Sequence, residues 1–216
     1  MKVDKKDNII IERIDSYNDK RFSQKILSEH GAFIVNDNDK KLLYEVEIIS
    51  ANEAIITGDD SKYFNKVIDL FRFYSENIST FFDRYGNVIK SFPKLQIFDI
   101  NIKDIQPSQF YVDETKLNEI SNFIKQEEDI IVPVVKYKNR YISLDGHTRL
   151  FYGVLNGFTR VKAYIPKVIN FDYMFFVNEA RERNINNIKD MKKLSHSEFD
   201  LLWNKFCDEN NKKNIN

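Results

Sequence analysis

The most informative part of the sequence is Ile142-Ser143-Leu144-Asp145-Gly146-His147-Thr148-Arg149-Leu150-Phe151-Tyr152-Gly153. Its pattern predicts a buried strand that runs through an Asp-Gly turn into a helix. Gly146 permits a tight bend of the backbone, and Thr148 is expected to cap the helix. The apolar face of that helix would consist of Leu150, Phe151, Val154 and Leu155.

A junction of this kind predicts an anion site, because backbone N–H groups point outward at a helix start, where the helix dipole favours negative charge. We expect the amides of Gly146, His147 and Thr148 to hold phosphate oxygens together with the guanidinium of Arg149. In this interpretation Asp145 orients His147 or helps to place Mg²⁺. Asp145 and His147 are the candidate catalytic residues. The structural alternative is that Arg149 pairs with a carboxylate and only holds the domain together.

The order of elements around this turn resembles that of the ParB/sulfiredoxin superfamily domain. The resemblance covers residues 98–165, roughly one third of the chain. Pro133 inside a strand and the Asn156-Gly157 helix exit fit the same pattern. The elements are expected at residues 100–105, 106–108, 114–125 (a helix), 131–135, 145–149 and 160–165. The resemblance implies a fold and a pocket, but not a reaction.

Two branches of the superfamily match less well. Sulfiredoxins place a reactive cysteine directly after the glycine of the box, and here His147 occupies that place. Their chemistry is therefore excluded, and Cys207 is too remote in sequence to be assumed a substitute. Partition ParB proteins carry an arginine-rich box for CTP and a helix-turn-helix domain, whereas this chain retains Arg149 alone.

The box is most similar to that of the free serine kinases of the same superfamily. Those kinases read Asp-Gly-His, a second polar residue and Arg, which matches residues 145–147 and Arg149. Their catalytic base is a glutamate two residues after a proline, and here that position is Gln109. A glutamine cannot accept the substrate proton. Glu114, at the start of the next helix, is the candidate substitute if it reaches the pocket.

These observations predict a protein that binds a nucleotide or another small phosphorylated ligand. The expected cofactor is Mg²⁺ with ATP, ADP or CTP. Any chemistry would be phosphoryl transfer or nucleotide hydrolysis, in which positioning and charge neutralisation dominate. The alternative, which stays open, is a non-catalytic nucleotide-sensing or DNA-associated regulatory module of ParB type.

Composition restricts other classes of function. The 33 basic and 33 acidic side chains cancel, so the net charge gives no support to a DNA partner. Cys207 is the single cysteine, which excludes intramolecular disulfides, and we expect no zinc, haem or flavin. The N-terminus lacks the apolar segment of a signal peptide, and no apolar run reaches membrane-spanning length. We therefore expect a cytoplasmic protein without membrane contact.

The chain is expected to be an α+β protein with three regions. Residues 1–94 would form an antiparallel meander, with strands near residues 32–35, 42–49 and 53–57, covered by a long amphipathic helix over residues 61–84. Residues 95–168 would form the ParB/sulfiredoxin-like domain. Residues 169–216 would be helical, with one helix over residues 171–183 and a capping box formed by Ser195 and Glu198. That box precedes an expected core stripe of Phe199, Leu202, Trp203 and Phe206.

Overall fold

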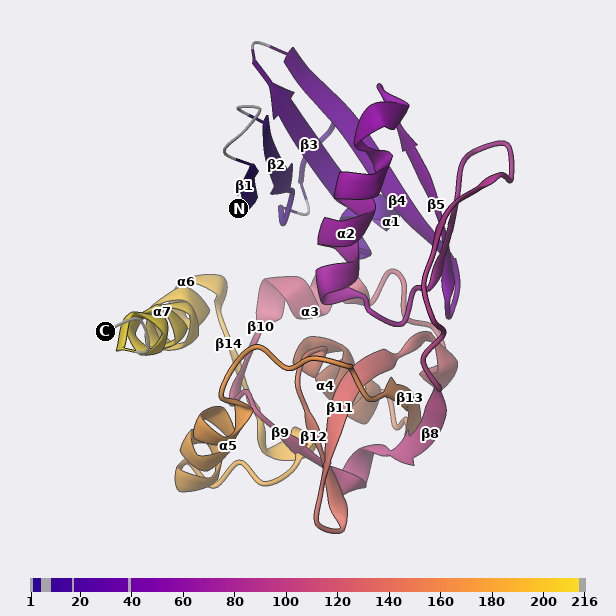
Figure 1. The fold of residues 1–216 in the computed structure, drawn as a ribbon. Coiled ribbons are helices and arrows are strands. Elements are labelled where there is room, and N and C mark those ends of the chain that lie inside the picture. Colours follow the sequence, from indigo (N-terminus) through magenta and orange to yellow (C-terminus); the bar gives the residue numbers. More distant parts are fainter. Residues whose placement is uncertain (1, 5–8, 17, 39, 214–216) are drawn as a thin grey trace. The chain divides into compact units, whose positions relative to one another are not determined.

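The computed structural model describes residues 2–4, 9–16, 18–38 and 40–213. These residues form a mixed α+β structure with three sheets, and the chain divides into two compact units, Met1–Leu95 and Gln96–Asn216 (Figure 1). Each unit contains its own buried hydrophobic core. No helix in the described part of the chain is both long and apolar enough to cross a membrane.

The first unit is built on a seven-stranded sheet in which the strands follow the order of the sequence. Its strands are β1 (Lys2–Asp4), β2 (Ile9–Arg13), β3 (Ala32–Asp37), β4 (Lys40–Ser50), β5 (Glu53–Gly58), β6 (Thr80–Phe82) and β7 (Val88–Ser91). All neighbours are antiparallel except β5 and β6, which are parallel. The expected three-stranded meander is present as β3 to β5, but it is the centre of a wider sheet.

Two helices cover opposite faces of this sheet. Successive side chains of a strand point to opposite faces. Helix α1 (Gln24–Ser28) packs with Ala32 and Ile34 of β3, whereas α2 (Phe64–Tyr74) packs with Phe33 and Val35. The larger core therefore lies under α2, which Figure 1 shows running along the sheet.

The predicted long helix over residues 61–84 is wrong. A single 3₁₀ turn (Ser61–Tyr63) precedes α2, which ends at Tyr74, and the chain then returns to the sheet as β6. Long-range hydrogen bonds hold the connection: Arg72 Nε donates to the Ile78 carbonyl at 2.9 Å, and Ser79 N donates to the Asn52 carbonyl at 2.8 Å. Ile78 and Phe81 are buried as their apolar pattern predicts, but as part of a loop and a strand.

The second unit contains a five-stranded mixed sheet in the order β8-β13-β11-β12-β9. These strands are β8 (Phe98–Asn101), β9 (Ile105–Pro107), β11 (Ile131–Tyr137), β12 (Arg140–Ser143) and β13 (Arg160–Tyr164). A separate pair, β10 (Tyr111–Asp113) and β14 (Lys192–Leu194), is parallel. The helices are α3 (Glu114–Ile120), α4 (His147–Leu155), α5 (Tyr173–Glu182), α6 (His196–Phe199) and α7 (Lys205–Lys213).

Two helices of this unit differ from expectation. The helix predicted over residues 114–125 ends at Ile120, because the Asp129 carboxylate accepts hydrogen bonds from Lys125 N and Gln126 N at 2.8 and 3.1 Å. The capping box of Ser195 and Glu198 is confirmed. A π-helical turn (Asp200–Asn204) then changes the helical period, so Leu202, predicted as core, is 45% exposed.

Candidate functional site

The predicted strand, turn and helix around residue 146 are all present. Strand β12 pairs with β11 on one side and with β9 on the other, so the chain leaves the interior of the sheet. Leu144 N continues the pairing by donating to the Pro133 carbonyl at 3.0 Å. Helix α4 then begins at His147 after the 145–149 turn, the name we use for Asp145 and the four residues that follow it.

Gly146 is required at this turn for two reasons. Its φ of +78° lies in the left-handed region, which glycine adopts without steric cost. A Cβ atom at this position would lie 2.5 Å from Cγ1 of Val132 and 3.1 Å from Nη2 of Arg149. The guanidinium of Arg149 therefore lies directly against the backbone of the turn.

The prediction that Thr148 caps α4 is wrong. The N-cap residue is Gly146, which has no side chain to supply a cap, and Leu150 N makes the first intrahelical hydrogen bond to its carbonyl at 2.9 Å. Thr148 lies inside the first turn. The N–H groups of His147, Thr148 and Arg149 precede that first bond and have no acceptor within the helix.

Arg149 is half-buried and keeps most of its hydrogen-bonding capacity. Its Nη1 donates to the Ile131 carbonyl at 3.1 Å. Within the described residues it forms no ion pair with a carboxylate, which is the contact that the structural alternative requires. A guanidinium carries five N–H donors in a planar fork, so most of them are available to a ligand.

His147 is buried behind the turn and is 5% exposed. Its Nε2 accepts a hydrogen bond from Ser108 N at 3.2 Å, and Ser108 Oγ donates to the Ser143 carbonyl at 2.8 Å. Burial lowers the pKa of His147 to about 4. The imidazole is thus neutral near pH 7. Its hydrogen bond to Ser108 connects the end of β9 to the 145–149 turn. Ser108 was not among the predicted site residues, although it ends the 106–108 element of the expected pattern.

The two predicted base positions have partners of their own. Gln109 is half-buried, and its Nε2 donates to the Tyr111 carbonyl. Glu114, the first residue of α3, forms an ion pair with Lys193 in which the carboxylate and Nζ are 2.6 Å apart. Asp145 is exposed at the turn. In the described residues no group of three or more His, Cys, Asp or Glu side chains is arranged to hold a metal ion.

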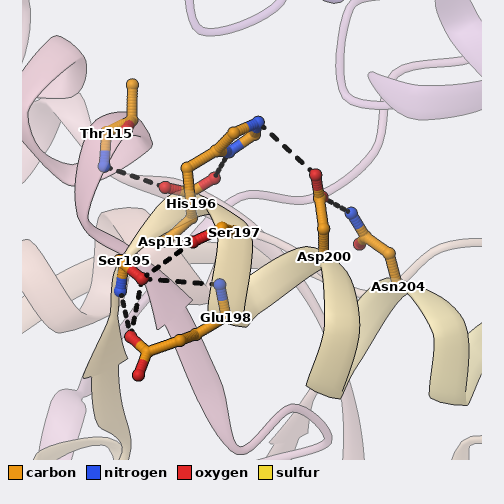
Figure 2. Close-up of polar contacts among 8 residues, drawn as sticks. All are labelled: Asp113, Thr115, Ser195, His196, Ser197, Glu198, Asp200 and Asn204. Carbon is orange, nitrogen blue, oxygen red and sulfur yellow. Dashed lines mark hydrogen bonds and ion pairs between the residues drawn. The ribbon is translucent and has the colours of Figure 1, made fainter.

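Sequence reasoning missed a second polar cluster, which links β10 and α3 to α6 (Figure 2). His196 lies between the two residues of the capping box, and its side chain is 61% exposed. Its Nδ1 nevertheless lies 2.7 Å from Oδ2 of Asp113, a fully buried carboxylate that also caps α3 through Thr115 N at 2.8 Å. The hydrogen bond to Asp113 raises the pKa of His196. This charge-assisted hydrogen bond connects α6 to the end of β10.

Comparisons with known proteins give little further information. No protein-family model matches the sequence, and no curated protein matches it. Among solved structures, the chain is similar to protein Atu1540 from Agrobacterium tumefaciens with 19% sequence identity and a TM-score of 0.34. The match covers 45% of this chain and 62% of the other protein. A TM-score of that size does not establish a shared fold.

Proposed function

We propose that the second unit binds a phosphorylated ligand, and specifically a nucleotide, at the 145–149 turn. One observation carries this proposal: the half-buried guanidinium of Arg149 lies against the left-handed Gly146 at the start of the nine-residue helix α4. We extend the proposal to the fold, and assign this unit to the ParB/sulfiredoxin superfamily that its sequence resembles.

The start of α4 attracts an anion in three ways. The helix dipole contributes about half a positive charge at the N-terminus of α4. The first N–H groups of the helix are donors without an intrahelical acceptor. Arg149 adds a full charge and a planar fork that matches two phosphate oxygens. A phosphate group satisfies all three, and water or a neutral ligand satisfies only the hydrogen bonds.

Asp145 and His147 have different roles in the proposal. The exposed carboxylate of Asp145 would hold Mg²⁺ jointly with ligand phosphates and water, because Mg²⁺ commonly takes only one or two carboxylates. The bound ion would neutralise charge during phosphoryl transfer or hydrolysis. His147 acts as a positioning residue, since its buried imidazole is neutral and its Nε2 is already bonded to Ser108.

The second candidate is a binding module without turnover, a nucleotide-sensing or DNA-associated regulator. It is favoured by the contacts of the two candidate bases. The Gln109 amide is held by the Tyr111 carbonyl, and Glu114 is paired with Lys193. Each contact would have to break before the side chain could approach a ligand at the turn. Under this proposal nucleotide binding alone carries the function.

The binding proposal is tested with Arg149→Ala and a matched control, Arg160→Ala. Arg160 is an arginine of the same unit whose guanidinium pairs with Asp99 at 3.5 Å on the surface. Calorimetric titration with ATP, ADP and CTP in the presence of Mg²⁺ should show binding that Arg149→Ala weakens by at least about tenfold, the loss expected for charge-assisted hydrogen bonds. Arg160→Ala should bind as the parent does.

The melting temperature of Arg149→Ala should stay within a few degrees of the parent value, because the lost contact inside the protein is one hydrogen bond. Retained binding with a large loss of stability would show that Arg149 is structural. Release of phosphate or transfer to serine, measured on the same samples, separates the enzyme from the module.

A further inference from the structure

The first unit contains a cavity of about 360 Å³ on the face of the sheet that carries α1. Its floor is formed by neighbouring residues of β4 and β5, and its walls come from the segment before α1 and from the turn between β6 and β7. The lining includes Arg21, Phe22, Leu43, Glu45, Thr57 and Arg84. A volume of this size falls within the range of small-molecule sites.

Glu45 supplies an uncommitted negative charge on the floor. It faces Thr57 across the β4–β5 pair, and its side chain forms no hydrogen bond or ion pair within the described residues. Partial burial raises the pKa of this carboxyl. The next carboxylate on the same face, Glu47, is already paired with Lys25 at 2.6 Å. An unpaired, half-buried carboxylate costs free energy, which a cationic partner would recover.

Arg84 supplies an uncommitted positive charge at the rim. Hydrogen bonds close its turn, because the Asp83 carboxylate accepts from Tyr85 N at 2.8 Å and from Asn87 N at 2.9 Å. In the part of the chain that the structure describes, Arg84 contacts the ring of Tyr85 but forms no ion pair. The guanidinium is therefore presented by a hydrogen-bonded turn without a carboxylate partner.

The other charged residues of the cavity already have hydrogen-bond partners. Arg21 is held by Asp19, whose Oδ1 accepts from Nε at 2.9 Å. Asp59 uses its carboxylate to accept from Leu43 N at 2.7 Å. Buried Phe22 and half-buried Leu43 form an apolar wall between these groups. A ligand can therefore contact the carboxylate of Glu45, the guanidinium of Arg84 and an apolar surface.

We propose that this cavity binds a small zwitterion of amino-acid size, with its ammonium group at Glu45, its carboxylate at Arg84 and its apolar part against Phe22 and Leu43. A simple anion would meet the unpaired charge of Glu45. A simple cation would meet the guanidinium of Arg84. A molecule with both charges satisfies both residues. The site belongs to the first unit and is independent of the nucleotide site proposed above.

The proposal is tested on the full chain with L-leucine as the probe and amide chemical shifts as the readout. Leucinamide lacks the carboxylate, and 4-methylpentanoate lacks the ammonium group. Leucine should give saturable shifts at residues of the cavity, and each analogue should bind at least about tenfold more weakly, because each loses a charge-assisted contact.

Variants test the contacts with the ammonium group and with the carboxylate separately. Glu45→Gln and Arg84→Gln should each weaken leucine binding by about tenfold or more. The matched controls are Glu47→Gln, which removes the neighbouring carboxylate, and Lys41→Gln, which removes a cation outside the cavity lining; both should bind leucine as the parent does. Thermal unfolding verifies that all four variants are folded.

Two results would overturn the proposal. The first is the absence of saturable shifts at millimolar leucine in the parent protein. The second is 4-methylpentanoate binding as tightly as leucine while Glu45→Gln has no effect, because that combination describes a plain anion site at Arg84.

Discussion

At the scale of single residues, His147 shows how burial changes the role that a sequence pattern predicts. A histidine in an Asp-Gly turn at a helix start has the appearance of an acid or base. Its imidazole is buried and bonded to Ser108, and burial lowers its pKa to about 4. A histidine with those properties holds a loop in place. The consequence for stability is opposite in sign to that of the exposed His196.

His147 should make the second unit less stable in mild acid. The pKa of His147 falls from an ordinary 6.5 to about 4 on folding, so the unfolded chain binds the proton first. Its contribution to stability is complete above pH 6.5 and is lost as the pH falls towards 4, a change on the order of 3 kcal/mol. Urea unfolding monitored by Trp203, the single tryptophan, measures it.

The comparison is His147→Gln, in a His196→Gln background. The pKa of His196 is raised, so its own contribution is lost as the pH rises, and the background removes that opposite trend. His147→Gln should flatten the pH dependence between pH 4 and 6.5. An equally steep dependence in His147→Gln would contradict a buried neutral imidazole.

At the scale of elements, the ends of a helix are set by specific contacts more than by its apolar stripe. Helix α2 ends at Tyr74 although apolar residues continue at helical spacing, because Arg72 donates to the Ile78 carbonyl. The ends of helix α4 are instead marked by residues next to it in the sequence. Gly146 and Gly157 lie at its two ends, and both have a positive φ. The space beside the Cα atom differs between these two glycines.

Gly146→Ala and Gly157→Ala form a matched pair for α4. Both put an alanine at a φ near +75°, which costs about 1–2 kcal/mol of unfolding free energy. A Cβ at Gly157 meets nothing within 4 Å, whereas one at Gly146 lies 2.5 Å from Val132 Cγ1. Gly146→Ala should therefore cost a further ~1–3 kcal/mol from overpacking.

Only Gly146→Ala should weaken nucleotide binding, because the added methyl group displaces Arg149. Urea unfolding monitored by Trp203 fluorescence, together with calorimetric titration, checks both effects. Equal losses of stability for the two variants would mean that the backbone of the turn relaxes and that the close approach is not rigid.

At the scale of the whole molecule, the chain behaves as two units with separate cores. Residues buried under α2 belong to one core, and residues between the five-stranded sheet and α4 belong to another. The division falls between Leu95 and Gln96. Domains of about this size fold alone when they have a core of their own.

Fragments 1–95 and 96–216 should each fold independently. Each should show a cooperative urea transition and the dispersed amide spectrum of a folded domain. Leucine should shift only the first fragment, and a nucleotide only the second. A fragment 96–216 that unfolds without cooperativity would contradict two independent cores.

Features that depend on neighbouring residues could be predicted from the amino-acid sequence. The strand, turn and helix around Gly146 follow from an apolar run, a glycine and a helical repeat, and the capping box of Ser195 and Glu198 follows from its spacing. Strands β3 to β5 follow from their composition and from the turn residues between them. Such signals act within one or two turns of chain, so a short window of sequence contains them.

Which polar groups meet, and which apolar residues belong to a helix, depends on contacts between distant parts of the chain. Asp113 and His196 are 83 positions apart, and the cavity brings Glu45 near a turn that contains Arg84. An apolar residue such as Phe81 must be buried, but a helix and a strand can both bury it. Whether such a residue lies in a helix or in a strand depends on long-range hydrogen bonds and on burial. These contacts favour one local conformation over the other, and residues distant in the sequence supply them.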